Sequence, residues 1–162
     1  MRITFSLLFI CCLIFSSDEI KAQNQKVNWL TFEQLEDSLA IKPKKVFINF
    51  YADWCAYCKK MDATAFKNQT VITLLNTNFY AVKMDAEYKK NITFGGKLFK
   101  NKQLSKSRRP MHEIPLLLGQ RPNANFSLPF TIILNPDFTV IQRDFEYISP
   151  KNMIAILTKS KI

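Results

Sequence analysis

The chain has 162 residues and a formal net charge of +10 at pH 7, and 48% of its residues are hydrophobic. This length predicts one domain with a hydrophobic core, and no internal repeat or second domain is visible. The basic residues are spread along the sequence without a nucleic-acid-binding motif. We therefore interpret the charge as a soluble basic surface that favours acidic partners, and not as evidence of nucleic-acid or membrane-surface binding.

The first 22 residues are typical of a secretory signal peptide. Met1-Arg2 gives a positive start, residues 3–15 form an apolar stretch of 13, and Ala22 stands before a plausible cleavage site. The alternative, a membrane anchor, requires roughly 20 apolar residues to span a bilayer. We expect residues 1–22 to be removed and residues 23–162 to form the mature domain, with no stable membrane insertion.

Strands and helices alternate through the first part of the mature chain. Val27–Leu30 predicts a short strand, Thr31 and Gln34 form a capping box at the start of a helix, and Pro43 ends that helix. The run at 45–51 is typical of a strand that is buried on both faces. Further elements are predicted as a helix over 55–66, a second helix through 71–75 and a strand over 79–85.

The segment from about 91 to 125 departs from this alternation. Gly95-Gly96 stands between two β-like arms and indicates a two-residue hairpin. Residues 102–109 are polar and basic, which predicts an exposed loop. A short helix is predicted over 111–118, with Gly119 as its C-cap.

The C-terminal part returns to regular elements. Strands are predicted over 130–134 and 139–147, joined by the turn Asn135-Pro136-Asp137. Ser149-Pro150 provides an N-cap and a first-turn proline for a final helix. Strands that alternate with helices indicate βαβ units, and the final hairpin adds an antiparallel pair to the sheet.

The most informative motif is Trp54-Cys55-Ala56-Tyr57-Cys58-Lys59, which follows the buried strand at 45–51. A strand followed by C-x-x-C and a helix places two thiols at a helix N-terminus, where backbone N–H groups and the helix dipole stabilise a thiolate. The thiolate is the nucleophile of disulfide exchange. The motif therefore predicts a redox-active pair.

Two other interpretations of the pair are weaker. Cys11 and Cys12 lie in the predicted signal peptide, which leaves Cys55 and Cys58 as the only cysteines of the mature chain. A bridge that closes so short a loop constrains the unfolded chain little, which argues against a structural staple. A structural zinc site needs four ligands, and the only other soft ligand is His112. We predict no metal and no organic cofactor.

The order of strand, Trp-Cys-x-x-Cys-Lys, helix, strand, and a proline before a hairpin and a last helix resembles the thioredoxin family. Residues 51–61 with Thr64-Ala65-Phe66 are similar to the periplasmic thioredoxin-like domain of transmembrane thiol:disulfide interchange reductases and to small exported thioredoxin-like proteins. The resemblance runs from about residue 27 to the C-terminus. It implies a three-layer α/β/α fold with a central mixed sheet and an insertion at about 91–125 (hairpin plus short helix) before a cis-proline.

The resemblance implies roles for individual residues. Cys55 would be the exposed attacking thiolate and Cys58 the buried resolving thiol. Pro129 matches the cis-proline beside the disulfide, because Pro115, Pro122 and Pro136 do not abut a strand start. Supporting or substrate-contacting roles are implied for Trp54, Tyr57, Lys59, Leu128 and Phe130.

Two departures from the family pattern concern the motif itself. Thioredoxins often hold a buried aspartate where this chain has Asn49, so the proton of Cys58 would pass to water or to a group such as Lys83 or Glu87. In the other interpretation Asn49 is an ordinary buried amide. The dipeptide Ala56-Tyr57 lacks a histidine that would make the pair strongly oxidising, which favours a reducing or intermediate couple.

A third departure is the 91–125 segment, which comes just before Pro129. Its candidates for substrate contact are His112, Glu113 and Phe126. If exposed, His112 would titrate near neutrality and could serve as an acid–base group. In the alternative interpretation, His112 has only a structural role.

We therefore expect an exported (periplasmic or secreted) thiol:disulfide oxidoreductase that acts as a disulfide reductase in cell redox homeostasis. Its partners would be protein or peptide disulfides and an external thiol electron donor, which could be membrane-bound. Two alternatives stay open: a disulfide oxidase or isomerase, and a thioredoxin-fold binding module whose thiols are not catalytic.

Overall fold

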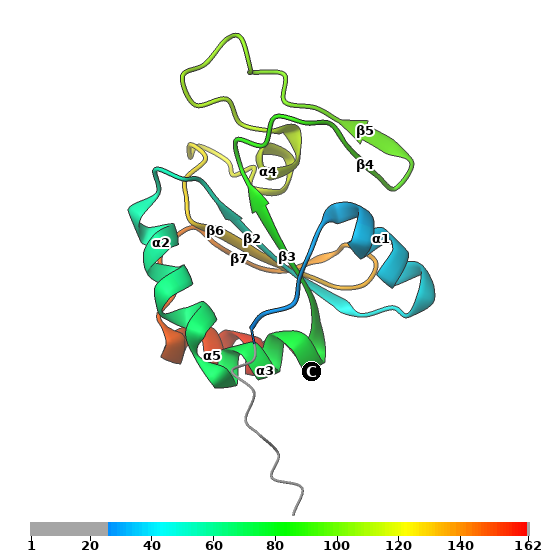
Figure 1. Cartoon of the computed structure of the whole chain (residues 1–162), viewed down its shortest axis with the longest axis vertical. Helices are drawn as coiled ribbons and strands as arrows, with labels where there is room; N and C mark the ends of the chain where they lie inside the picture. The colour runs from blue at the N-terminus through cyan, green and yellow to red at the C-terminus, as the bar shows by residue number, and fades with distance from the viewer. Residues whose placement is uncertain (1–25, 162) are drawn as a thin grey trace, which may run out of the picture.

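The computed structural model describes residues 26–161, so the predicted signal peptide lies outside it. Its centre is a five-stranded sheet in the order β1-β3-β2-β6-β7 (Figure 1). Strands β1, β3 and β2 are parallel, whereas β6 and β7 are antiparallel to their neighbours, which confirms the mixed sheet. The strands are β1 (Trp29–Leu30), β2 (Lys45–Tyr51), β3 (Phe79–Asp85), β6 (Phe130–Leu134) and β7 (Val140–Asp144).

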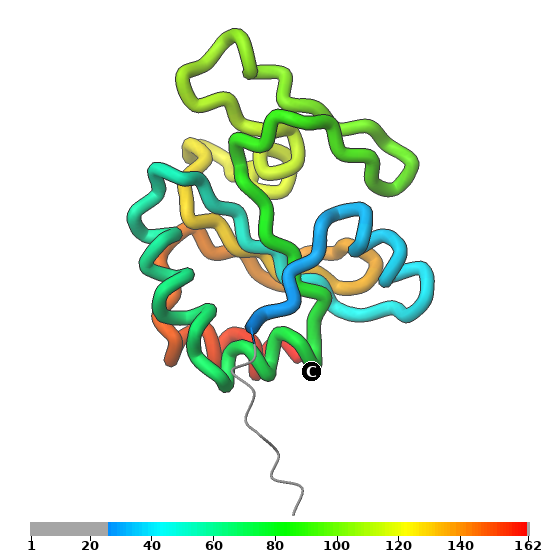
Figure 2. The backbone as a smooth tube through the Cα atoms, in the orientation of Figure 1, coloured from blue at the N-terminus to red at the C-terminus, as the bar shows by residue number. Residues whose placement is uncertain are grey.

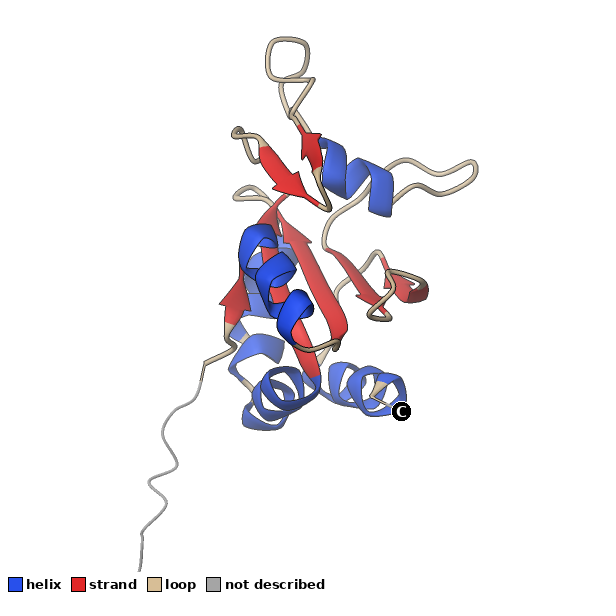
Figure 3. Ribbon diagram, turned by 90° about the vertical axis from the view of Figure 1, so that its right-hand side faces the viewer, coloured by secondary structure: helices blue, strands red, loops and turns tan. Residues whose placement is uncertain are grey.

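Helices cover both faces of the sheet, which gives the predicted three layers (Figures 1 and 3). Helices α2 (Ala56–Ala63), α3 (Gln69–Asn78) and α5 (Pro150–Ser160) pack on one face. Helix α1 (Phe32–Ile41) and the 91–125 segment pack on the other face. Within residues 26–161, no helix has the length and apolar character needed to cross a bilayer.

Strand β2 supplies both hydrophobic cores because residues 46–50 are all buried. Phe47 belongs to the core beneath α2, α3 and α5, whereas Ile48 and Phe50 belong to the core on the α1 side. Successive side chains of a strand point to opposite faces. Full burial of one such side chain contributes about 1.5–3 kcal/mol, so β2 is fixed from both sides.

The predicted starts of two helices are confirmed. Thr31 Oγ1 accepts the N–H of Gln34 at 3.2 Å, and the Gln34 side chain accepts the N–H of Thr31 at 2.9 Å, which completes the capping box of α1. Ser149 Oγ accepts the N–H of Asn152 at 3.3 Å at the start of α5. These bonds satisfy backbone donors that a helix leaves unpaired at its N-terminus.

Helix α2 ends earlier than predicted, at Ala63 instead of residue 66. The N–H of Thr64 is shared between the carbonyls of Lys60 and Met61, and a 3₁₀ turn follows at Ala65–Lys67. Apolar periodicity could not reveal this break, because Ala65 and Phe66 of the turn bury their side chains in the same core as the helix.

The two edge strands are shorter than predicted. Strand β1 begins only at Trp29, and β7 ends at Asp144 instead of residue 147. The chain leaves the sheet after Asp144 because Phe145 stacks its ring on that of Phe130, with ring centroids 4.4 Å apart.

The 91–125 segment lies between β3 and β6 as an outgrowth at one end of the sheet (Figure 2). It contains the predicted hairpin, β4 (Ile92–Phe94) and β5 (Lys97–Phe99), with positive φ values of 58° and 68° at Gly95 and Gly96. Two successive residues with positive φ suit a tight hairpin turn. Helix α4 (Glu113–Leu118) follows, and it starts two residues later than predicted.

Gly119 caps α4, as predicted, but not in a left-handed conformation. Its φ is −93°, and its N–H donates to the Pro115 carbonyl at 2.9 Å. A Cβ at this position would lie 2.8 Å both from the Phe126 ring and from that carbonyl oxygen. The absence of space, and not the backbone conformation, therefore requires glycine here.

We expect Gly119→Ala to lower the free energy of unfolding by about 1–3 kcal/mol, because the added methyl group overpacks the site. Urea denaturation measures the change. Leu117→Ala is the matched control, since Leu117 is an exposed residue of the same helix and should change stability by about 0.5 kcal/mol or less. Equal stability of Gly119→Ala and the parent protein would contradict the packing argument.

Candidate active site

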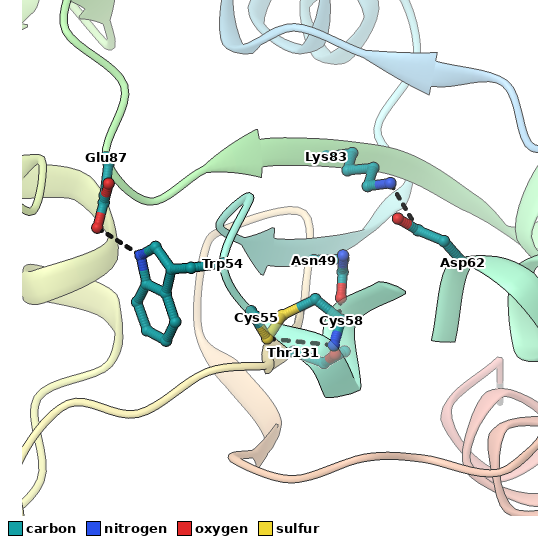
Figure 4. The surroundings of a disulfide bond; sticks show 8 residues. All are labelled: Asn49, Trp54, Cys55, Cys58, Asp62, Lys83, Glu87 and Thr131. Atoms are coloured by element: carbon teal, nitrogen blue, oxygen red, sulfur yellow. Dashed lines mark hydrogen bonds and ion pairs between the residues drawn. A yellow bond between two sulfur atoms is a disulfide. The ribbon is translucent and has the colours of Figure 1, made fainter. Parts of the chain in front are cut away.

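The cysteine pair lies where the carboxyl end of β2 passes into α2 (Figure 4). Tyr51 ends the strand, residues 52–54 turn, and Cys55 is the N-cap of the helix. Cys55 and Cys58 form a disulfide with a sulfur–sulfur distance of 2.01 Å. The predicted order of strand, motif and helix thus places both sulfurs at the first turn of α2.

The two cysteines differ in hydrogen bonding and not in exposure. Cys55 is 4% exposed and Cys58 is 3% exposed, so the expected contrast between an exposed and a buried thiol is absent in the disulfide-bonded state. The reason is that Cys55 caps the helix: its Sγ accepts the N–H of Cys58 at 3.1 Å, which draws the side chain over the helix N-terminus. This N–H and the helix dipole stabilise negative charge on Cys55.

The peptide bond between Leu128 and Pro129 is cis, as predicted. Pro129 immediately precedes β6, in which Phe130 pairs with Phe50 of β2. This pairing places Pro129 beside the end of β2, where the cysteine motif begins.

A groove of about 420 Å³ lies between the motif and the Pro129 loop. It brings together three residues selected from the sequence with three from the chain that follows β7. The lining residues are Tyr57, Leu128, Pro129, Phe145, Glu146 and Tyr147. Three of the lining side chains are aromatic, and one of them, Tyr57, lies between the two cysteines of the motif.

The side chain of Phe130 is fully buried. The prediction that this side chain contacts substrate is therefore wrong. Its ring is stacked on Phe50, with centroids 5.2 Å apart, and on Phe145, with centroids 4.4 Å apart. A central strand turns alternate side chains into the core, and Phe130 is one of them. The aromatic stack fixes the strand that carries the Pro129 turn.

Asn49 is buried beneath the motif, and its Oδ1 accepts the Thr131 hydroxyl at 3.4 Å (Figure 4). Lys83 and Glu87 were considered as proton acceptors in place of the missing aspartate. Neither is hydrogen-bonded to Asn49. Lys83 forms an ion pair with Asp62 at 2.6 Å, and Glu87 lies on the opposite side of the disulfide in this view. Asn49 is therefore a buried amide with a hydroxyl partner.

Trp54 contacts charged side chains on two sides and is 43% exposed. Its indole N–H donates to Oε1 of Glu87 at 2.7 Å (Figure 4). The guanidinium of Arg109 lies over the ring, with its carbon 3.9 Å from the ring centroid, in a cation–π contact. Because Arg109 comes from the 91–125 segment, that segment borders the cysteine motif.

His112 is fully buried, so the hypothesis of an exposed acid–base group in contact with substrate is wrong. It is the N-cap of α4, where its Nδ1 accepts the N–H of Ile114 at 3.2 Å. Accepting at Nδ1 requires the neutral ring, and burial lowers the pKa of His112. The other candidates of this segment also have internal partners, since Glu113 pairs with Lys102 and Phe126 packs on the aromatic core.

The charges around the motif are mixed. Lys59 is exposed directly after Cys58. At the end of β3, burial raises the pKa of the Asp85 carboxyl, although a hydrogen bond from the N–H of Glu87 at 2.9 Å opposes this shift. Among residues 26–161, no three His, Cys, Asp or Glu side chains cluster in a way that could hold a metal ion. The arrangement is suited to thiol chemistry.

Four residues of the site were not selected from the sequence: Arg109, Phe145, Glu146 and Tyr147. Arg109 belonged only to a predicted exposed loop, and residues 145–147 belonged only to a predicted strand. The polar stretch that precedes Phe145 could have suggested that the strand ends there. No local signal distinguishes Arg109 from its neighbour Arg108, because its partner Trp54 is distant in sequence.

Comparisons with known proteins agree with this geometry. The model of the family Thioredox_DsbH, described as a protein of unknown function, DUF255, matches residues 16–112. The thiol:disulfide interchange protein DsbD of Campylobacter jejuni (strain RM1221) is 30% identical over 60 residues, which are 37% of this chain. The match spans only 10% of the length of that relative.

Solved structures share the fold. The structure described as DsbH oxidoreductase superposes with a TM-score of 0.56 at 16% identity, covering 85% of this chain and 83% of the other. A thioredoxin from Thermus thermophilus gives a TM-score of 0.60 at 15% identity, covering 85% and 89%. The three-layer α/β/α thioredoxin fold expected from the sequence is confirmed.

We expect stability to fall as the pH drops through the unfolded-state pKa of histidine, which is about 6.5. Burial holds the folded-state pKa of His112 below that value, so the unfolded chain takes up the proton first and is favoured at low pH. His112→Asn keeps an N-cap acceptor but cannot titrate. Urea denaturation between about pH 7 and pH 5 should show a smaller loss of stability in this variant. Identical pH profiles would contradict the assignment.

Proposed function

The chain belongs to the Thioredox_DsbH family, and from this premise we propose that it is an exported thiol:disulfide oxidoreductase that acts as a disulfide reductase through Cys55 and Cys58. The observation that carries the proposal is the hydrogen bond from the Cys58 N–H to Cys55 Sγ at the start of α2. This bond favours the thiolate of Cys55 at a position beside cis Pro129 and the groove.

The first step forms a mixed disulfide. The thiolate of reduced Cys55 attacks one sulfur of a substrate disulfide, a bond forms between the two sulfurs, and the substrate disulfide breaks. The second substrate sulfur leaves as a thiolate and takes up a proton from water. Tyr57, Leu128 and Pro129 line the groove in which the substrate chain would lie, and Trp54 would shelter the reacting sulfur.

The second step releases the product. The Cys58 thiol loses its proton and attacks Sγ of Cys55, which frees the reduced substrate and leaves the Cys55–Cys58 disulfide that the structure contains. Two electrons pass to the substrate, and an external dithiol donor must return them. Asn49 cannot accept the proton of Cys58, so the proton passes to water or to another group. The two steps require neither a metal nor an organic cofactor.

The dipeptide Ala56-Tyr57 supports the proposed direction of electron flow. Tyr57 is 61% exposed and carries no charge that would add to the helix dipole at the thiolate, as an intervening histidine would. A less stabilised thiolate makes the dithiol a better electron donor. This supports a reductase over the alternatives of an oxidase or an isomerase.

Export is part of the proposal. Residues 1–22 have the composition of a signal peptide, and residues 23–162 would form the mature domain, with 91–125 as an insertion in the thioredoxin fold. The substrates would be protein or peptide disulfides in the periplasm or outside the cell. The thiol donor could be membrane-bound, as the resemblance to the thioredoxin-like domain of transmembrane thiol:disulfide interchange reductases implies.

We expect Cys58→Ser to accumulate mixed disulfides with substrate proteins, because the variant retains the attacking thiolate but cannot resolve the intermediate. Non-reducing electrophoresis of protein isolated from the exporting cell, with and without dithiothreitol, detects them. Cys55→Ser is the matched control and should form none of these adducts. The absence of adducts from both variants would contradict the exchange mechanism.

The reduction potential should lie nearer to about −270 mV, the value of thioredoxin, than to about −120 mV, the value of a strong oxidant. Equilibration of the Cys55–Cys58 pair in dithiothreitol buffers of graded composition measures it. A reduction potential near about −120 mV would overturn the reductase assignment and favour a disulfide oxidase.

A further inference from the structure

A basic loop approaches the cysteine motif. Residues 102–109 contain Lys102, Lys106, Arg108 and Arg109 and no acidic residue. Arg109 is the member of this group that lies over Trp54, and Trp54 directly precedes Cys55. The fold therefore places one guanidinium over the side chain of the residue that precedes the attacking cysteine.

Hydrogen bonds hold the chain on both sides of Arg109. The N–H of Arg109 donates to Ser107 Oγ at 3.1 Å. The buried side chain of Asn101 donates from Nδ2 to the carbonyl of Pro110 at 2.7 Å and to the carbonyl of Tyr88 at 3.1 Å. The position of Arg109 is thus set by an interior polar group and not only by its surface contact.

The same network also positions Glu87, the second charged residue in contact with Trp54. The N–H of His112 donates to the carbonyl of Ala86 at 2.8 Å, which ties the 91–125 segment to the residue before Glu87. Glu87 accepts the indole N–H of Trp54 at 2.7 Å. Because both contacts of the indole belong to one hydrogen-bonded unit, Trp54 and the cation over it are organised before any substrate binds.

The guanidinium of Arg109 has no ion-pair partner among residues 26–161. Three carboxylates of this region have other partners: Glu87 accepts the indole N–H, Asp85 accepts the N–H of Glu87, and Glu113 pairs with Lys102. Asp53, next to Trp54, is exposed and forms no ion pair with Arg109. Stacking uses the face of the guanidinium and leaves its N–H groups free at the edge. A planar fork of N–H donors fits a carboxylate.

We propose that Arg109 is a specificity-determining residue, whose guanidinium binds a carboxylate of the disulfide substrate beside Cys55, so that the protein prefers disulfides flanked by acidic residues. This inference rests on the oxidoreductase function proposed above. The partner is a protein or peptide chain with Asp or Glu near its cystine, and Trp54 with Arg109 forms the surface that receives the acidic residue.

The expected preference for acidic substrates is small, because the ion pair between Arg109 and a substrate carboxylate would be exposed to solvent. Arg109 is exposed, so its interaction with a carboxylate is screened by water and salt. A solvent-exposed ion pair supports a preference of about two- to fivefold. Since the cation is already in place, little side-chain entropy is lost on binding, and the preference should approach the upper end of that range.

The test compares disulfides that differ only in charge. Two peptides, each dimerised through a single cystine, carry Glu or Gln at the same flanking positions, and bis(2-hydroxyethyl) disulfide provides a small uncharged substrate. Rapid mixing of the fully reduced protein with each disulfide gives a second-order rate constant and requires no electron donor. Each peptide rate is divided by the rate with the small disulfide, which removes any general change in thiol reactivity.

Three variants separate charge from geometry. Arg109→Gln should reduce the Glu-over-Gln preference to about one, because the cation is lost. Arg109→Lys keeps the charge but not the planar fork, and should retain part of the preference. Arg108→Gln is the matched control, since it removes one charge from the same loop, and it should leave the preference unchanged. High salt should weaken the preference of the parent protein.

Two results would overturn the inference while leaving the oxidoreductase function intact. One is a parent protein that reduces all three disulfides with no preference for the Glu peptide. The other is an equal loss of preference in Arg108→Gln and Arg109→Gln, which would assign the effect to general charge. Failure to reduce any of the three disulfides, including the uncharged one, would overturn the proposed function and the inference with it.

Discussion

Strand β2 must bury both of its faces, and the positions of the functional groups follow from that requirement. It lies between the parallel strand β3 and the antiparallel strand β6. Parallel neighbours end at the same edge of a sheet, whereas an antiparallel neighbour begins there. The cysteine motif after β2, residues 86–87 after β3 and Pro129 before β6 therefore meet at one edge. The site is the place where three strand ends converge around the start of α2.

The elements that could be predicted are specified by residues that lie close together in the sequence. The capping box of Thr31 and Gln34, the continuous apolar run of β2 and the Gly95-Gly96 turn each specify their own local structure. The C-x-x-C motif is local in the same sense, because the strand and helix that position it flank it directly. Pro129 was identifiable because of its place before a strand.

The parts that could not be predicted depend on contacts between distant segments. A histidine before a short helix has the same local pattern whether it faces water or the interior, and only the packing of the 91–125 segment buries His112. The arginine over Trp54 belongs to a loop whose sequence predicts nothing beyond exposure. Cys55 and Cys58 could not be ranked by exposure, because capping of the helix draws the first sulfur inward.

The sulfur of Cys55 is at once the reacting atom and the cap of α2. A thiolate accepts the N–H of Cys58 more strongly than a neutral disulfide sulfur does, because a charge-assisted hydrogen bond is about twice as strong as a neutral one. The order of the first helical turn is therefore thermodynamically linked to the oxidation state of the pair. Substitutions that loosen or tighten this turn, even ones that touch neither cysteine, change the affinity of the protein for electrons.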